Sequence, residues 1–370
     1  MASASNSQWR DIRRMRADPP GAAAGDAPIA LEGRRAVFSA ALEQSEQLFA
    51  AAAAADHGIR PMLLFYGLSQ AGRAIAAAAN SLEDGWRPSA HGLTCGGSAV
   101  RGAQHLADLR VWASGNQPRP GRRPTRDQED GAGAFGILCD VLESPNWQDS
   151  STESVSLGAL FAAHPELPDF PNREEWPAIQ AAPYPASELI GTHTNVASLT
   201  ILRPPAWMLD RRDEIPDRYL EFAGLSMRLV PLDAPNPADP QTELLGVYPD
   251  DKQPTRALTD WLRPPGLPRP WLTPRLAGTT GRQHPLVLWW AVLFALSIRA
   301  RYDPQGWTRD LDPDTTNYAV VLQELLDIAT VECPQHIFWA IRQVSGDHIP
   351  VEQRVMYRVR HSDLLTLPTF

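Results

Sequence analysis

The spacing of apolar residues predicts long helices in the first quarter of the chain. Between residues 32 and 59, Val37, Ala41, Leu48 and Ala52 lie on one helical face, with Glu and Gln opposite. This is the pattern of an amphipathic helix. We expect Gly58 to end it and a second helix to begin at Arg60-Pro61, because proline suits a first helical turn.

The last third is also predicted to be helical. Residues 285–302 are apolar on nearly all sides, so we expect them to form a central, buried helix. Two more helices are predicted, one over residues 311–332 and one over residues 335–346. Asp312 or Asp314 is a candidate cap for the first, and Gly346 is expected to end the second.

The middle of the chain has a different pattern. Residues 134–144 and 156–167 are predicted to be short helices, whereas the runs 193–205, 224–232 and 244–249 are partly β-branched and lie between Pro- and Asp-rich clusters. Such runs are typical of short strands. The predicted fold is mainly α, with a small β-sheet contributed by the middle segment, and is therefore α+β overall.

These patterns divide the chain into four parts. They are a flexible N-terminal segment (1–30), a helical core built from residues 31–114 and 271–346, a loop-rich middle lobe with short helices and strands (115–270), and a C-terminal tail (347–370). We expect residues 31–80 to pack against residues 285–346, which makes the middle lobe an insertion.

Composition narrows the function classes. The net charge of −9 excludes nucleic-acid binding by bulk charge but leaves room for a local basic patch. The three cysteines are far apart, and no histidine pair has metal-ligand spacing, so neither a metal site nor a cofactor is expected. The N-terminus has no secretory signal, and the longest apolar run is shorter than the ~20 residues of a spanning helix. We predict a cytoplasmic protein without membrane contact.

One short stretch, "LLFYGLSQAGR", allows two interpretations. Gly67, Ser69 and Ala71 resemble a nucleophile elbow, in which a serine lies on a sharp turn between a strand and a helix. Ala71 replaces the last glycine of that motif, however, and no strands are predicted upstream. The alternative is a single helix from Pro61 onwards, in which the small residues permit close helix packing. The helix is favoured.

Several cations and aromatic residues are candidates for binding. Arg299, Arg301, Tyr302 and Trp307 follow the most apolar helix directly. Charges at the end of a buried helix must be paired or solvated, and pairing is a sufficient explanation. The functional alternative is that the arginines bind an anion, with Tyr302 or Trp307 stacking on it. Arg73 is a long cation on a helix of small residues, where it needs an acid, a carbonyl or a ligand.

Three segments together resemble the YaaC-like family of bacterial proteins. They are "RPMLLFYGLSQAGRAIAAAA", "HGL" at residues 91–93, and "HPLVLWWAVLFALSIRARYDPQGW". The resemblance extends from Trp9 to Ile341 and is weak between residues 115 and 270. The family implies no established catalytic residues. The positions that carry the resemblance are Arg60, Tyr66, Gly67, Gln70, Arg73, His91, Gly92, Arg301, Tyr302, Pro304 and Trp307.

Three functions remain open on the sequence. The first is a non-catalytic binding or adaptor component, in a bacterial defence or stress system, with an unidentified protein or a second copy as partner. The second is a HEPN-like helical protein that acts on RNA or a nucleotide and uses Arg73, His91 or Arg301. HEPN nucleases carry Arg and His about four to six residues apart, as Arg342 and His348 are here. The third is a serine hydrolase using Ser69.

Overall fold

We describe the computed structural model over most of the chain. The described residues are 2–21, 28–88, 90–95, 105–113, 133–147, 154–167, 175–184, 198–201, 206–220, 227–232, 244–249, 271–276, 279 and 283–346. The predicted C-terminal tail lies outside them.

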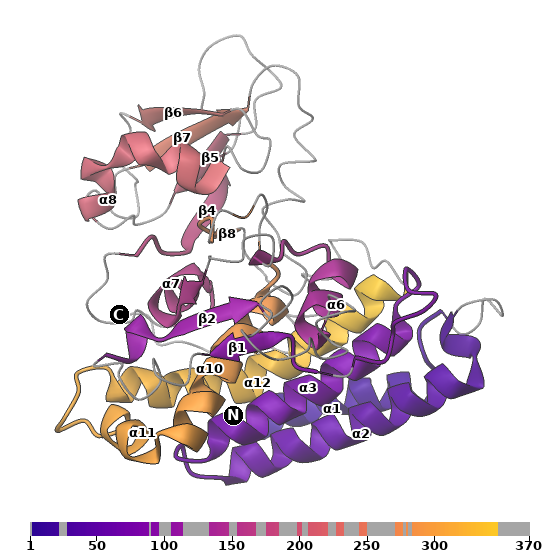
Figure 1. The fold of residues 1–370 in the computed structure, drawn as a ribbon. Coiled ribbons are helices and arrows are strands. Elements are labelled where there is room, and N and C mark those ends of the chain that lie inside the picture. Colours follow the sequence, from indigo (N-terminus) through magenta and orange to yellow (C-terminus); the bar gives the residue numbers. More distant parts are fainter. Residues whose placement is uncertain are drawn as a thin grey trace, which may run out of the picture.

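Long helices form the main body of the protein. Figure 1 shows α1 (Ala2–Ala17), α2 (Glu32–Ala54), α3 (Arg60–Ala78) and α12 (Ala319–Val344) lying lengthwise beside one another. Helix α3 contacts α2, α12 and α10 (Pro285–Tyr302), and a short helix α11 (Pro304–Asp310) follows α10. The two helical blocks that are far apart in the sequence therefore share one core.

Helix α1 is part of this core. Trp9, Ile12 and Met15 are buried, and the Trp9 ring lies 5.5 Å from that of Phe49 on α2. This differs from the flexible segment predicted for residues 1–30. The three apolar residues recur at three-residue intervals, so one helical face can be buried although the rest of the helix is polar.

Helix α10 lies at the centre of the molecule. It is apolar enough and long enough to cross a membrane, yet 83% of it is buried. Its neighbours are α3, α12, α6 (Ala134–Val141) and α7 (Leu157–Ala163). Protein rather than lipid surrounds the apolar surface, as in a core helix.

Helix α12 runs unbroken through Pro334. The prediction of two separate helices here is wrong, as is the prediction that Asp312 or Asp314 caps the first of them. The helix begins at Ala319, whereas Asp312 accepts hydrogen bonds from the Asp314 backbone and the Thr315 hydroxyl in the preceding turn. Packing of the apolar face on both sides of Pro334 outweighs the lost backbone hydrogen bond.

Two antiparallel sheets complete the fold. The first has the order β1-β2-β3, and Thr94 pairs with Trp112 and Val111 with Val155. The second has the order β6-β7-β5-β4-β8. The strands are β1 (Leu93–Cys95), β2 (Arg110–Ala113), β3 (Val155–Ser156), β4 (Ile179–Tyr184), β5 (Ser198–Ile201), β6 (Met227–Leu232), β7 (Leu244–Pro249) and β8 (Trp271–Leu272). The fold is mainly α with a small β component, as predicted, and β5, β6 and β7 lie within the three predicted runs.

The five-stranded sheet stands apart from the long helices, beyond α7 and the three-stranded sheet (Figure 1). Helix α8 (Ala206–Asp210) and two short helical turns, Arg212–Glu214 and Pro216–Leu220, lie on its side of the molecule. The backbone N–H of Ala178 donates to the carbonyl of Ala162 at 2.6 Å, which joins the chain leading into β4 to helix α7. Because α6 packs on α3 and α10, and α7 packs on α10, these two helices of the predicted middle lobe belong to the core.

Candidate functional site

The small residues of α3 allow close helix packing. A Cβ at Gly67 would lie 2.8 Å from the Phe49 ring of α2, and one at Gly72 would lie 2.6 Å from the Trp290 ring of α10. Ser69 lies between them in the middle of α3 and is 7% exposed. A nucleophile elbow needs a strand, a sharp turn and an exposed serine. The helix interpretation is therefore correct, and the structure excludes the elbow.

Two of the candidate binding residues have structural roles instead. The guanidinium of Arg299 is 2% exposed and donates to Asp310 at 2.9 Å and to Asp303 at 2.6 Å. Trp307 is also buried, and its Nε1 donates to the Gly58 carbonyl at 2.9 Å. These contacts fasten α11 to α10 and to the turn between α2 and α3. Neither side chain is free to hold a ligand.

The outer face of α3 presents polar groups. Tyr66, Gln70 and Arg73 follow one another at spacings of four and three residues, so they lie on one side of the helix. Tyr66 is 38% exposed, and Arg73 is also exposed. At the end of α10, Arg301 is exposed and donates from Nη1 to the Tyr66 hydroxyl at 2.9 Å. Tyr302, 57% exposed, lies with its ring 4.6 Å from the same guanidinium.

His91 is held firmly beside this face. Its backbone carbonyl and that of Ala90 accept hydrogen bonds from the first N–H groups of α6, at 3.1 and 2.8 Å. The next residue, Gly92, has a φ of +75° and packs directly on Gly133, where no side chain would fit. The imidazole ring packs against Phe65 at 5.1 Å, Tyr66 at 6.3 Å and Phe294 at 6.4 Å.

Arg73, His91 and Arg301 are brought together at one place. Burial lowers the pKa of His91, and the positive charges of Arg301 and Arg73 lower it further. Within the described part of the chain, no ion pair joins Arg73 or Arg301 to a carboxylate. We call Tyr66, Arg73, His91 and Arg301 the cationic cluster. It has two guanidinium groups, a histidine that is mostly neutral at pH 7, and an exposed phenol ring.

A second polar group is buried in the core, and sequence reasoning did not find it. His336 Nε2 on α12 lies 2.7 Å from Glu166 Oε2, which also accepts a hydrogen bond from Trp289 Nε1 at 3.0 Å. Burial lowers the pKa of His164 to about 3, with the charge of Glu166 opposing this shift. The two contacts of Glu166 join residues 170 and 123 positions apart, so no local pattern could have revealed them.

The chemistry of this buried group is limited. Burial raises the pKa of the Cys333 thiol, and the negative charge of Glu166 raises it further, so Cys333 is not a thiolate nucleophile. Among the described residues, no three His, Cys, Asp or Glu side chains are placed to hold a metal ion. His348, the proposed HEPN partner of Arg342, lies outside the described residues.

The family model described as YaaC-like Protein matches residues 32–341. The chain belongs to the YaaC-like family. No curated protein and no solved structure matches it. The YaaC-like region begins with α2, ends within α12 and includes every member of the cationic cluster.

Two groups can be distinguished among the positions that carry the YaaC-like resemblance. Gly67, Gly92, Arg60 and Trp307 have packing or bonding roles; Arg60, for example, donates to the Ala55 carbonyl at 2.7 Å. Tyr66, Arg73 and Arg301 of the cationic cluster are instead exposed, whereas the His91 ring packs against three aromatic rings. Packing therefore does not explain these three exposed side chains of the YaaC-like motifs.

Proposed function

We propose that this protein is a non-catalytic binding protein that recognises a phosphate group of single-stranded RNA or of a nucleotide through the cationic cluster. The observation that carries the proposal is that Arg301 donates to the Tyr66 hydroxyl at 2.9 Å while the Tyr66 ring packs 6.3 Å from that of His91. The positive charges of Arg301 and Arg73 act with burial to lower the pKa of His91. Two guanidinium groups without carboxylate partners in the described part of the chain favour an anion as their missing partner.

The chemistry of the cluster suits a phosphate that is attached to a base. Guanidinium groups bind phosphate oxygens through paired hydrogen bonds, and the exposed rings of Tyr66 and Tyr302 offer faces on which a base can stack. Stacking tolerates any base, and single strands leave their bases free for it. The net charge of −9 opposes nucleic-acid binding over the whole surface, so the binding is expected to be confined to the cluster.

His91 makes the proposed binding depend on pH. A bound phosphate adds negative charge beside the imidazole and so raises the pKa of His91 above its value in the free protein. Binding then takes up a proton, and affinity increases as the pH falls through the pKa of the complex. His91→Gln keeps a polar side chain but cannot titrate, so it should remove this part of the pH dependence.

The experiment measures fluorescence anisotropy of a short labelled single-stranded RNA, with competition by unlabelled nucleoside monophosphate. The test variant is Arg73→Gln/Arg301→Gln. The matched control is Arg309→Gln, because Arg309 is an exposed arginine on the neighbouring α11 and lies outside the cluster. Loss of two phosphate contacts should lower the slope of log affinity against log salt by about 1.4 for a single strand. The control should retain the slope of the unchanged protein.

Competition and salt dependence distinguish RNA from a free nucleotide as the ligand. If the cluster binds RNA, a nucleoside monophosphate competes only weakly and affinity depends strongly on salt. If it binds a free nucleotide, the monophosphate competes fully and the salt slope is small. The proposal is wrong if neither ligand binds the unchanged protein, or if the double variant binds as the control does.

A second function, RNA cleavage, is favoured by one observation. A histidine with a lowered pKa between two arginines is suited to remove a proton while the cations stabilise the charge on a phosphate. Cleavage of the labelled RNA by the unchanged protein, together with its loss in His91→Ala, would replace the binding proposal. A role in bacterial defence or stress, a protein partner and a cytoplasmic location stay predictions.

A further inference from the structure

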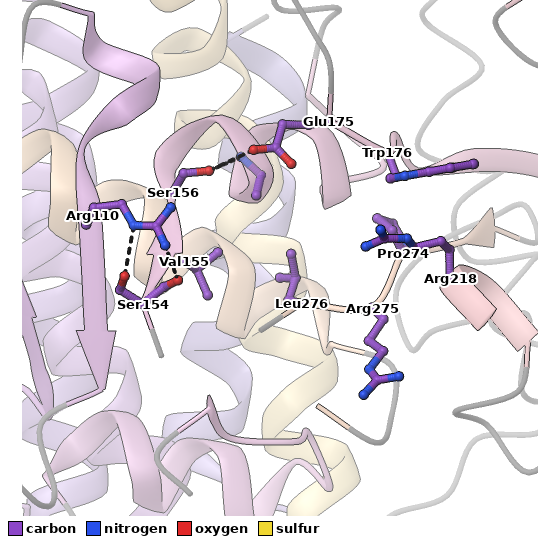
Figure 2. A pocket seen from close by; sticks show the side chains of 11 residues that line it. Arg110, Ser154, Val155, Ser156, Glu175, Trp176, Arg218, Pro274, Arg275 and Leu276 are labelled. Carbon is purple, nitrogen blue, oxygen red and sulfur yellow. Dashed lines mark hydrogen bonds between the residues drawn. The ribbon is translucent and has the colours of Figure 1, made fainter. Parts of the chain in front are cut away.

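A polar cavity lies between the helical core and the five-stranded sheet, away from the cationic cluster. Its volume is about 190 Å³. In Figure 2, Arg110, Ser154 and Ser156 lie on one side of it, and Arg218 and Arg275 lie on the other. The two sides come from different parts of the fold: β2 and β3 on the core side, and the segments beside the five-stranded sheet on the other.

On the core side of the cavity, Ser154 holds the side chain of Arg110 in place. Arg110 donates from Nε to the Ser154 hydroxyl at 2.8 Å and from Nη2 to the Ser154 carbonyl at 2.9 Å. A guanidinium has five N–H groups, so this anchoring leaves donors for a further acceptor. Next to it, the Ser156 hydroxyl donates to Glu175 at 3.0 Å, which places one carboxylate at the edge of the cavity.

The other side is fixed by aromatic packing and a backbone hydrogen bond. The guanidinium of Arg218 lies 5.8 Å from the buried ring of Trp176, and Trp176 packs edge-on against Tyr219 at 5.9 Å. Arg275 donates its backbone N–H to the Arg218 carbonyl at 2.8 Å, and its side chain reaches Asp217 at 3.4 Å. Arg218 Nη2 also lies 3.7 Å from a Glu214 carboxylate oxygen, so each guanidinium on this side is positioned by a carboxylate, and the backbone hydrogen bond holds the two residues together.

We propose that this cavity binds the phosphate group of a small phosphate monoester. Three arginines line the cavity, and Glu175 is the one carboxylate among the lining residues. Asp217 and Glu214 pair with Arg275 and Arg218 but do not line the cavity, and a guanidinium paired on one side keeps donors for the oxygens of a phosphate. The size of the cavity agrees with this ligand. A volume of about 190 Å³ has room for a phosphate group, and because the cavity is open to solvent on one side, the remainder of the ligand can extend out of it.

The position of the cavity links ligand binding to the stability of the fold. Because its two sides belong to the core and to the segments beside the five-stranded sheet, a bound phosphate would bridge Arg110 to Arg218 and Arg275. A ligand that binds only the folded chain stabilises it by mass action. Binding is thus expected to raise the thermal stability of the whole chain.

The experiment is calorimetric titration of the full chain with inorganic phosphate and with glycerol 3-phosphate, with uncharged glycerol as the ligand control. The variants are Arg218→Gln and Arg275→Gln, and Arg309→Gln is the protein control. We expect one phosphate to bind per chain. Each test variant should weaken binding about tenfold to a hundredfold, whereas Arg309→Gln should leave it unchanged. Circular dichroism checks that the variants are folded.

Glu175→Gln should change the affinity for phosphate in the opposite direction. Removing a negative charge beside a bound anion should tighten phosphate binding about tenfold. The cavity proposal is wrong if neither phosphate ligand binds, if Arg218→Gln and Arg275→Gln bind as the unchanged protein does, or if Glu175→Gln weakens binding. Loss of RNA binding in Arg73→Gln/Arg301→Gln tests the cationic cluster separately, because the two sites share no residue.

Discussion

The contact between α3 and α10 depends on the absence of a side chain at Gly72. A Cβ at this position would lie 2.6 and 2.8 Å from Cζ3 and Cη2 of the Trp290 indole, well inside ordinary contact distance. Trp290 has no exposed surface, so its ring cannot move aside into solvent. Gly72→Ala therefore forces either the ring or helix α10 to shift.

The expected magnitude follows from two opposing effects. Overpacking a core lowers the free energy of unfolding by about 1–3 kcal/mol. Replacing a glycine inside a helix by alanine raises it by about 1 kcal/mol. Gly72→Ala should thus lower the free energy of unfolding by about 1 kcal/mol. Gly33→Ala on α2 is the matched control, because its Cβ would meet only Arg87, at 3.8 Å. It should raise stability by a few tenths to about 1 kcal/mol.

Urea unfolding followed by far-ultraviolet circular dichroism measures both changes as shifts in midpoint. A third protein, Trp290→Phe, lacks the indole carbons that clash. In that background Gly72→Ala should cost less than in the unchanged protein, which gives a coupling energy of about 1 kcal/mol in a double-mutant cycle. The packing argument is refuted if Gly72→Ala is as stabilising as Gly33→Ala, or if its effect is the same in both backgrounds.

Three further predictions concern stability and can be measured by the same unfolding assay. Burial lowers the pKa of His164 to about 3, so below the ordinary value of 6.5 the unfolded chain binds a proton here and the folded chain does not. Stability should fall as the pH falls, by about 2 kcal/mol at about pH 5, and His164→Asn should flatten that part of the profile. Asp310→Ala leaves the buried Arg299 guanidinium without one of its carboxylates and should cost about 3 kcal/mol, whereas Arg309→Ala should have little effect. Trp9→Ala should cost about 3 kcal/mol and speed proteolysis after α1; an unchanged midpoint would show that α1 does not pack.

Local sequence patterns were sufficient for most of the helices. The starts of α3 and α10, the end of α12 just before Gly346 and the buried character of α10 follow from proline, glycine and apolar spacing. The strands β5, β6 and β7 also lie within runs that the sequence marked. These features depend on residues within a few positions of one another, which is the range over which turn chemistry and periodicity act.

The local sequence did not predict the shortest strands. The strands β1 and β3 span three and two residues, which is too short for a periodic pattern, and they exist because β2 pairs with both. The continuity of α12 through Pro334 was likewise decided by packing on either side of the proline. Such elements depend on partners elsewhere in the chain, so a window of sequence does not contain the information.

The same distinction holds for the candidate sites. The sequence by itself identified Arg73, His91 and Arg301 as residues to test, and it established membership of the YaaC-like family. Only the tertiary structure separated the buried, paired Arg299 from the exposed Arg301, two positions away on the same helix. Only the structure shows that Tyr66 and Arg301, 235 residues apart, form a hydrogen bond, and that Arg110, Arg218 and Arg275 line one cavity. Charge and residue type are local properties, whereas burial and pairing depend on which distant segments meet.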